Sequence, residues 1–331
     1  MVKYTIKRLV MIIPITLVVI LVLFLMLYLV AGSSMTQLRI YGGGDMLDRV
    51  FERFKASENF FTKYIRYCYN VIVHLDFGRS SATRLRLIGE LDYRVKNTML
   101  LLATGVGATL LIGIPLGVVA AVRKNRPLDR IINVISLLLS AIPSYSMAIA
   151  VTLILAVYLR ILPVVISYIS PLAYIMPMIT LSLGGIASIA RMSRASMIEE
   201  LEQPYITALR SKGLRERTVI YKHALKNALV PVISSLGGLI AQLLCGTFVV
   251  EHFFNVPGLG SYMLRSVGSR SHLEILGCTI IMTMILAVTN VLTDVLYSLV
   301  NPQIKLRYSR GSSRMRLPPV VPANVRKEAA E

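Results

Sequence analysis

Residues 205–230 read YITALRSKGLRERTVIYKHALKNALV and interrupt a chain that otherwise consists of one apolar run after another. Basic residues recur along this stretch, against a single acidic residue, Glu216. The pattern is helical on both sides of Gly213, and glycine accepts the left-handed conformation that often ends a helix. Pro204 starts a new helix because it biases Gln203 away from helical geometry. The stretch therefore predicts a short helix that projects between two longer ones.

The composition places the rest of the chain in a lipid bilayer. Of the 331 residues, 55% are hydrophobic and 16% are charged, and the mean hydropathy is +0.66. Such a chain is too apolar for a soluble domain with a polar surface. A helix needs about 20 predominantly apolar residues to cross the hydrocarbon. We therefore predict an all-α integral membrane protein with six transmembrane helices, at Leu9–Val30, Thr98–Val122, Ile131–Leu159, Pro171–Ala190, Leu229–Val250 and Ile275–Val300.

Basic residues are divided unevenly between the two sides of the membrane. These spans place 22 Lys and Arg residues on one side and 14 on the other. The richer side is cytoplasmic by the positive-inside rule, so both termini and the 191–229 loop are expected in the cytoplasm. The first span is a retained anchor, because its apolar run is longer than the core of a signal peptide. Most of the net charge of +19 is then a topological signal, and no binding of nucleic acid is expected.

The sequence divides into four regions: residues 1–30 with the first span, an extracytoplasmic loop at 31–97, a five-helix core at 98–300, and a tail at 301–331 that is expected to be disordered. The loop predicts two short amphipathic helices that lie on the bilayer or cap the helix bundle. Contact with a substrate or partner is the alternative. The apolar positions behind this prediction are Met46, Leu47, Val50, Phe51 and Phe54, then Phe61, Tyr64, Ile65, Cys68, Val71 and Ile72.

A turn follows the fifth span, in the segment Val249–Leu264. Pro257 and Gly258 favour a type II turn, in which glycine takes a positive φ, and Gly260 permits a second bend. Apolar residues surround the turn, which favours a re-entrant or interfacial excursion over a solvated loop. His252 beside Glu251 is too small a set of ligands to predict a metal site.

The motifs of several enzyme classes are missing. The sequence contains no P-loop for ATP, no zinc-protease motif and no serine-hydrolase motif. Three cysteines lie far apart, so neither a zinc site nor a disulfide framework is expected. We expect neither a catalytic residue nor a metal or cofactor site in this chain.

A few polar residues lie inside the predicted spans and are candidates for the pathway or for an interface: Gln242, Asn290 and Asp294. An ionisable residue at membrane depth is a functional candidate by default. Asp294, however, lies near the cytoplasmic end of its span, so a cap or an ion pair is favoured over proton relay. Glycines in the second and fifth spans are expected to let neighbouring helices pack closely.

The loop also carries the motif of a known family. PYITALRSKGLRERTVIYKHALKNALVP, at 204–231, resembles the cytoplasmic loop of permease subunits in binding-protein-dependent ATP-binding-cassette importers, in the dipeptide, oligopeptide and nickel class. LDFGRS at 75–80, RPLDRIINVISLLLSAIPSY at 126–145 and VVEHFFNVPGLGSYM at 249–263 resemble further segments of that class, in the same order. Two departures are Leu209, where the class usually has Arg, and Asn301, where it usually has Asp.

The resemblance implies the six-helix type I importer permease fold and a set of partners. A second permease subunit, two cytoplasmic ATPases that bind ATP and Mg²⁺, and an extracytoplasmic binding protein are expected. The loop is then a coupling helix that docks on the ATPase, at Tyr205, Thr207, Ala208, Leu209, Lys212, Gly213 and Leu214. The expected cargo is di- or oligopeptides, with oligosaccharides or nickel complexes as alternatives. An ion-coupled carrier and a non-transporting membrane scaffold are the rival functions.

Overall fold

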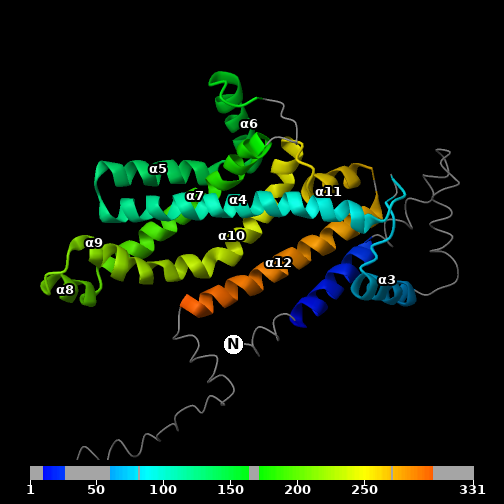
Figure 1. Ribbon diagram of the computed structural model, residues 1–331, viewed down its shortest axis with the longest axis horizontal. Coiled ribbons are helices and arrows are strands. Elements are labelled where there is room, and N and C mark those ends of the chain that lie inside the picture. The colour runs from blue at the N-terminus through cyan, green and yellow to red at the C-terminus, as the bar shows by residue number, and fades with distance from the viewer. Residues whose placement is uncertain (1–9, 27–59, 81–82, 164–170, 270, 301–331) are drawn as a thin grey trace, which may run out of the picture.

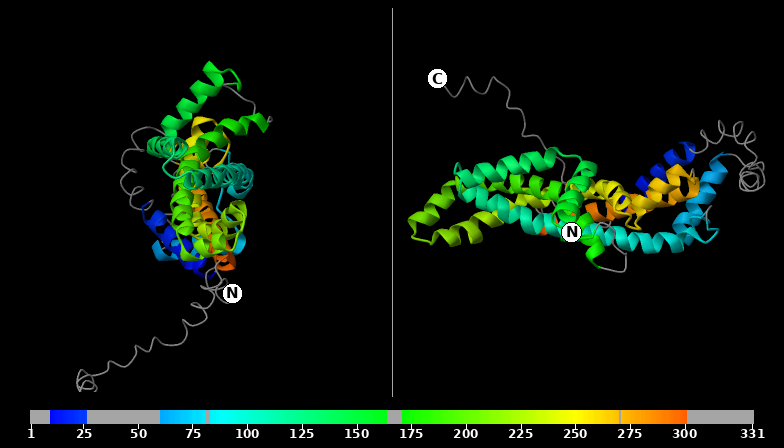
Figure 2. Two further views of the ribbon diagram at one scale, coloured as in Figure 1. Left: turned by 90° about the vertical axis from the view of Figure 1, so that its left-hand side faces the viewer. Right: turned by 90° about the horizontal axis from the view of Figure 1, so that it is seen from above.

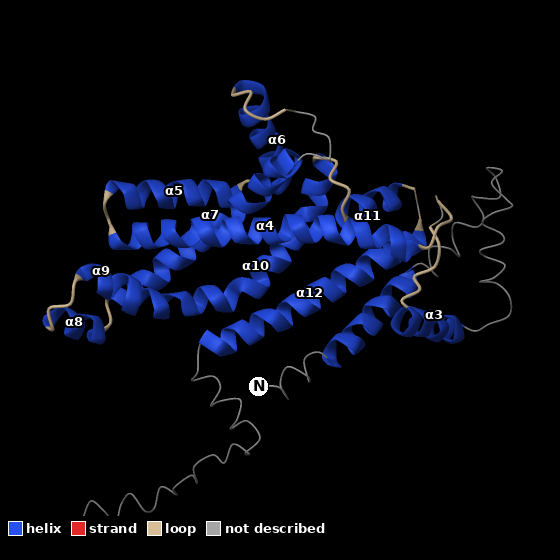
Figure 3. Cartoon of the chain, viewed as in Figure 1, coloured by secondary structure: helices blue, strands red, loops and turns tan. Residues whose placement is uncertain are grey.

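The computed structural model describes residues 10–26, 60–80, 83–163, 171–269 and 271–300, and these residues form helices without a β-strand (Figure 3). Any functional site among these residues therefore lies at helix ends, on helix faces or in the short connections between helices. In chain order the elements are an N-terminal helix Val10–Met26, α3 Phe60–His74, α4 Leu87–Val122, α5 Pro127–Ala141, α6 Ser144–Thr152 with the π-helical turn η1 Leu153–Tyr158, η2 Pro171–Tyr174, α7 Ile175–Leu201, α8 Pro204–Ser211, α9 Glu216–Thr218, η3 Val219–Ala224, α10 Leu225–Phe253, α11 Leu259–Gly268 and α12 His272–Val300.

Four stretches are long and apolar enough to cross a membrane: Leu87–Val122, Ile175–Leu201, Glu216–Phe253 and Leu273–Val295. The N-terminal helix is apolar but shorter. The long helices run side by side along the length of the molecule (Figures 1 and 2). A helical membrane protein with several spans is confirmed, while the count of six crossings stays a prediction.

The third predicted span is not one helix. The prediction of a single helix over Ile131–Leu159 is wrong, because α5 and the segment that contains α6 and η1 meet at an angle of 111°. Pro143 causes the break. Its ring fixes φ and removes an N–H group, and it pushes Ile142 into an extended conformation with ψ 125°. In Figure 1 α5 lies along the bundle, whereas α6 turns away from it.

Close packing between α4 and α7 forms the centre of the bundle. A side chain at Gly117 would place its Cβ 2.5 Å from the carbonyl oxygen of Ala190 and 2.6 Å from Cβ of Ser193. Only glycine fits there, which supports the prediction that small residues bring these helices together. Gly107 and Gly238 have open space around them, so the same prediction is wrong for these two positions.

The second span begins earlier than predicted, at Leu87 instead of Thr98. Leu87 and Leu91 are fully buried and pack in one apolar cluster with residues of α3, α11 and α12. Of the two helices predicted between 31 and 97, the second is confirmed as α3, with Cys68 and Val71 buried. The first falls at 46–54, outside the described residues, as does the tail at 301–331.

Candidate functional site

Helix α8 lies at one end of the molecule, beyond the ends of α7 and α10 (Figure 1). Pro204 is its first residue and Gln203 before it is extended, with ψ 143°. After the last residue, Ser211, the chain reverses at Gly213, whose φ is +75°. That conformation is costly for a residue with a side chain. The short projecting helix predicted from the sequence is therefore confirmed.

Ile206 fixes α8 to the bundle. Its side chain is fully buried, in a cluster with Val118 of α4, Met197 of α7 and Ile220 of η3. Leu209 is half-buried against the same cluster. Burying an isoleucine side chain contributes about 2 kcal/mol. Ile206 is not among the residues predicted from the sequence, although its spacing from Leu209 is that of a buried helical stripe.

A polar contact joins α8 to both of its neighbouring helices. The hydroxyl of Tyr205 donates a hydrogen bond to Glu200 of α7. Nδ2 of Asn227 in α10 donates to the same carboxylate over 2.9 Å and to the Tyr205 oxygen over 3.1 Å. Burial and the bond to Glu200 raise the pKa of Tyr205 to about 12, so the hydroxyl stays a donor at neutral pH. Displacement of α8 thus pulls on α7 and α10 together.

The exposed side of α8 and the turn after it carry further predicted residues. Thr207, Ala208, Lys212 and Leu214 are exposed, and Tyr205 is 38% exposed. These side chains are open to another protein because α8 projects beyond the ends of α7 and α10 (Figure 1). This face is the docking surface considered below, defined as Tyr205, Thr207, Ala208, Lys212 and Leu214.

The turn between α4 and α5 is clamped to α7 near the same end. Asp129, whose side chain is 3% exposed, accepts two hydrogen bonds from Arg194 over 2.5 and 2.8 Å. It also accepts a bond from the backbone N–H of Asn125, which has φ +66°. A bidentate, largely buried pair of this kind fixes both position and direction. Helix α5 is therefore tied to the helix that leads into α8.

A second polar cluster lies at the opposite end, around α11. Glu251 of α10 is fully buried, and its carboxylate accepts hydrogen bonds from the Thr98 hydroxyl over 2.7 Å and from the N–H groups of Gly260 and Ser261 over 2.7 and 3.1 Å. A carboxylate in this place satisfies the free N–H groups of the first turn of α11. The Thr98 hydroxyl in turn accepts from the N–H of Leu259 over 2.8 Å.

The predicted type II turn at Pro257 and Gly258 is wrong. Gly258 has φ −104°, and the positive φ in this segment belongs to Asn255, at 57°. Glycine is required at 258 for space instead, since a Cβ there would lie 2.3 Å from the carboxyl carbon of Glu251. The bond between Thr98 and Glu251 joins residues that are 153 positions apart, so no local pattern could have predicted it.

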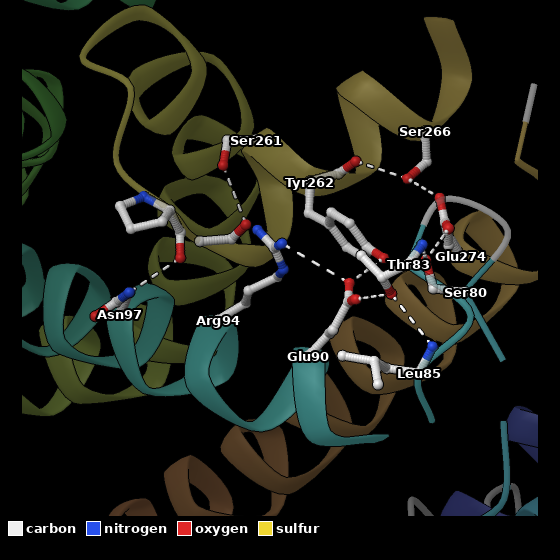
Figure 4. Close-up of polar contacts among 12 residues, drawn as sticks. Ser80, Thr83, Leu85, Glu90, Arg94, Asn97, Ser261, Tyr262, Ser266 and Glu274 are labelled. Carbon is white, nitrogen blue, oxygen red and sulfur yellow. Dashed lines mark hydrogen bonds and ion pairs between the residues drawn. The ribbon is translucent and has the colours of Figure 1, made fainter. Parts of the chain in front are cut away.

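Further hydrogen bonds hold α11 to α4 and α12 (Figure 4). Tyr262 donates to Glu90 of α4 over 2.8 Å, and the guanidinium of Arg94 stacks 3.8 Å from the centre of the Tyr262 ring. Glu274 of α12 accepts bonds from Ser80 over 2.7 Å and from Ser266 over 3.0 Å. This end of the bundle is therefore held together by buried carboxylates, and the other end by α8 and its contacts.

The polar residues predicted for the pathway or for an interface lie in two places on α10 and α12. Gln242 on α10 is exposed and lines a cavity beside the break between α5 and α6. Asn290 and Asp294 lie one turn apart on α12, and Oδ1 of Asn290 approaches Gly237 of α10. Asn290 therefore belongs to the contact between α10 and α12, whereas a role for Asp294 stays a prediction.

Residues 113–306 match the family described as the binding-protein-dependent transport system inner membrane component. The chain belongs to this family. It is 33% identical over 308 residues to the dipeptide transport system permease protein DppB of Bacillus subtilis, across 92% of this chain and 99% of that protein. It is 30% identical to the glutathione transport system permease protein GsiC of Escherichia coli, across 93% of this chain and all of that protein.

A solved structure shares the helical arrangement. The MetNI methionine ABC transporter in an inward-facing conformation contains a chain that superposes with a TM-score of 0.54, at 17% identity, over 65% of this chain and 97% of that chain. The fold of an importer permease is therefore present. The resemblance drawn from the loop and the segments around it is confirmed at the level of the family.

Proposed function

We propose that this chain is one permease subunit of an ATP-driven importer and forms half of a translocation pathway for di- or oligopeptides. The observation that carries the proposal is α8: a short helix with one buried anchor, a projecting exposed face and polar ties to two long helices. Membership of the permease family and the names of its relatives, which transport dipeptides and glutathione, support the assignment.

In this proposal the docking surface fits a groove on a cytoplasmic ATPase. When two ATPases close on ATP, α8 moves with its groove, and Ile206 and the Tyr205–Glu200–Asn227 contact pass that movement to α7 and α10. A rigid helix held at one end can turn domain closure into tilting of spans, which shifts the balance of inward- and outward-facing states. The free energy comes from ATP and Mg²⁺ in the ATPases.

The same proposal fixes the orientation. The α8 end faces the cytoplasm together with both termini, in a plasma membrane that the chain crosses six times. The α11 end faces outward, where a binding protein delivers the cargo to this subunit and to a second permease subunit. The positive-inside distribution of Lys and Arg supports this orientation.

Reconstitution separates this function from its rivals. Proteoliposomes that contain both permeases and both ATPases should transport a tripeptide toward the side of the membrane that α8 faces. This transport needs ATP on the α8 side and binding protein carrying the tripeptide on the opposite side. This chain alone should not import the peptide under a proton gradient. Import driven by the gradient alone would show an ion-coupled carrier, and a complex that hydrolyses ATP but moves no cargo of any class would favour the scaffold.

Substitutions in α8 test its role within that complex. Gly213→Val places a β-branched residue at φ +75°, which costs about 1–3 kcal/mol, and Ala208→Glu puts a charge on the docking surface. Both should abolish import and copurification of the ATPases while the chain still inserts in the membrane. Gly213→Asn, which tolerates positive φ, is the matched control and should retain most import.

A further inference from the structure

The break between α5 and α6 leaves backbone N–H groups without helical partners. Pro143 occupies the position before α6 and provides no side-chain cap, and the first helical bond is donated by Met147 to the carbonyl of Pro143. The N–H groups of Ser144, Tyr145 and Ser146 therefore point out of the start of α6, and these three residues are exposed. The start of a helix also carries a partial positive charge.

A cavity of about 50 Å³ lies at this break. Its walls come from three elements: Ile142 and Ser144 at the break, Thr180 and Gly184 of α7, and Gln242 and Gly246 of α10. The cavity is too small for a peptide but has room for a single polar group, since one water needs roughly 10–15 Å³ by this measure.

Thr180 is an unusual threonine in this cavity wall. It is 3% exposed, and its hydroxyl has no hydrogen-bond partner among the described residues. Thr104, Thr152 and Thr279 are also in helices, and each donates to the carbonyl one turn back. A buried hydroxyl without a partner costs about 1–3 kcal/mol, so an acceptor that enters the cavity gains this hydrogen bond.

A positive charge lies next to the break. Nη1 of Arg191 in α7 donates to Oγ of Ser140, in the last turn of α5, over 2.8 Å. Arg191 is ten residues before the end of α7 at Leu201, about 15 Å along the helix. Within the described part of the chain no carboxylate pairs with Arg191, so its charge is available to an anionic group that passes along α7 from the break.

We propose that the break between α5 and α6 is a subsite for the free carboxylate of a peptide in transit. The N–H groups at the start of α6 and the Thr180 hydroxyl donate hydrogen bonds to it, and Arg191 provides the positive charge as the carboxylate moves toward the α8 end. Broken helices in membrane proteins bind anionic groups in this way. This inference rests on the proposed function, because it names the part of the cargo that this subunit recognises.

The test compares trialanine with trialanine amide in proteoliposomes that contain the whole transporter. The affinity of the binding protein for each peptide is measured first, and the binding protein is then used at saturation so that delivery is equal. Wild type should import trialanine faster than the amide. Thr180→Val and Arg191→Gln should each lower import of trialanine about tenfold, the size expected for losing a hydrogen bond to a charged group, and change import of the amide less than twofold.

Conservative variants and a matched control separate recognition from folding. Thr180→Ser and Arg191→Lys keep a donor and a charge and should retain most of the preference for trialanine. Thr152→Val makes the same chemical change on α6 at a hydroxyl that is already bonded, to Ala148, and should leave both peptides unaffected. Ser140→Ala removes only the partner of Arg191 within the bundle and should leave the preference intact.

The subsite is overturned if Thr180→Val and Arg191→Gln slow both peptides equally or slow neither, or if Ser140→Ala abolishes the preference as Arg191→Gln does. Equal loss would mean that Arg191 only supports the end of α5. If wild type imports no peptide while the complex hydrolyses ATP, the proposed function fails and the subsite fails with it. The two failures are thus distinguishable by the wild-type rate alone.

Discussion

Replacement of Ile206 by alanine should loosen α8 without unfolding the bundle. Ile206 is fully buried, and its cluster draws on α4, α7, η3 and α10. Truncating a buried isoleucine to alanine costs about 2–5 kcal/mol. We expect about 3 kcal/mol, because α8 lies at the edge of the cluster and can partly close the gap. Since no described residue packs on the exposed face of α8, the loss falls on α8 and its docking to α7 and η3.

Hydrogen exchange of the α8 amides measures this loss directly. Local opening that is easier by about 3 kcal/mol makes exchange roughly 100-fold faster at Leu209, Arg210 and Ser211, while amides in the middle of α7 keep their protection. Thr207→Ala, at an exposed position of the same helix, is the control and should change exchange less than about threefold. Unchanged exchange in Ile206→Ala would refute the argument that this side chain anchors α8, and faster exchange throughout α7 would show that the cluster is not local.

Two other substitutions test the buried polar contacts at the two ends of the molecule. Gly258→Ala drives a Cβ into the carboxylate of Glu251 and should lower the free energy of unfolding by about 3 kcal/mol, because the cap on α11 is lost. Gly268→Ala, at a position with open space around it, should change stability by less than about 1 kcal/mol in thermal unfolding. Equal effects of the two substitutions would contradict the steric argument. Asp129→Asn leaves Arg194 without its charge partner and should lower the free energy of unfolding by roughly 3 kcal/mol. Lys124→Ala removes the exposed ion pair with Glu202 on the same turn and should lower it by less than about 1 kcal/mol. A small effect of Asp129→Asn would mean that the pair with Arg194 does not hold the turn to α7.

Local patterns in the sequence were sufficient to predict some elements. The helix α8 follows from Pro204 and Gly213, whose backbone preferences act on their immediate neighbours. The long helices follow from apolar length alone. The break at Pro143 could also have been read from the sequence, because the residue before a proline is pushed out of helical geometry. Hydropathy averaged over the span conceals such a break, so the apolar run at Ile131–Leu159 predicts one continuous helix.

Other features depend on contacts between distant residues. The role of Glu251 requires Thr98 on one helix and the start of α11 on another, and no spacing rule connects them. The same holds for Thr180, which is notable only because no neighbour accepts its hydrogen bond. Ile206 is an intermediate case. Its spacing from Leu209 was sufficient to predict burial, although that prediction was not made, and the partners that make it an anchor come from α4 and η3.

The most direct test of the central claim is cross-linking from the docking surface. A single cysteine at Ala208, in a chain whose native cysteines are replaced by alanine, should form a cross-link to an ATPase subunit in the assembled transporter, and its yield should change when ATP is trapped by vanadate. A cysteine at Ser269, exposed at the end of α11, should form none. Cross-linking to the ATPase from Ser269 but not from Ala208 would contradict the assignment of α8 as the coupling helix.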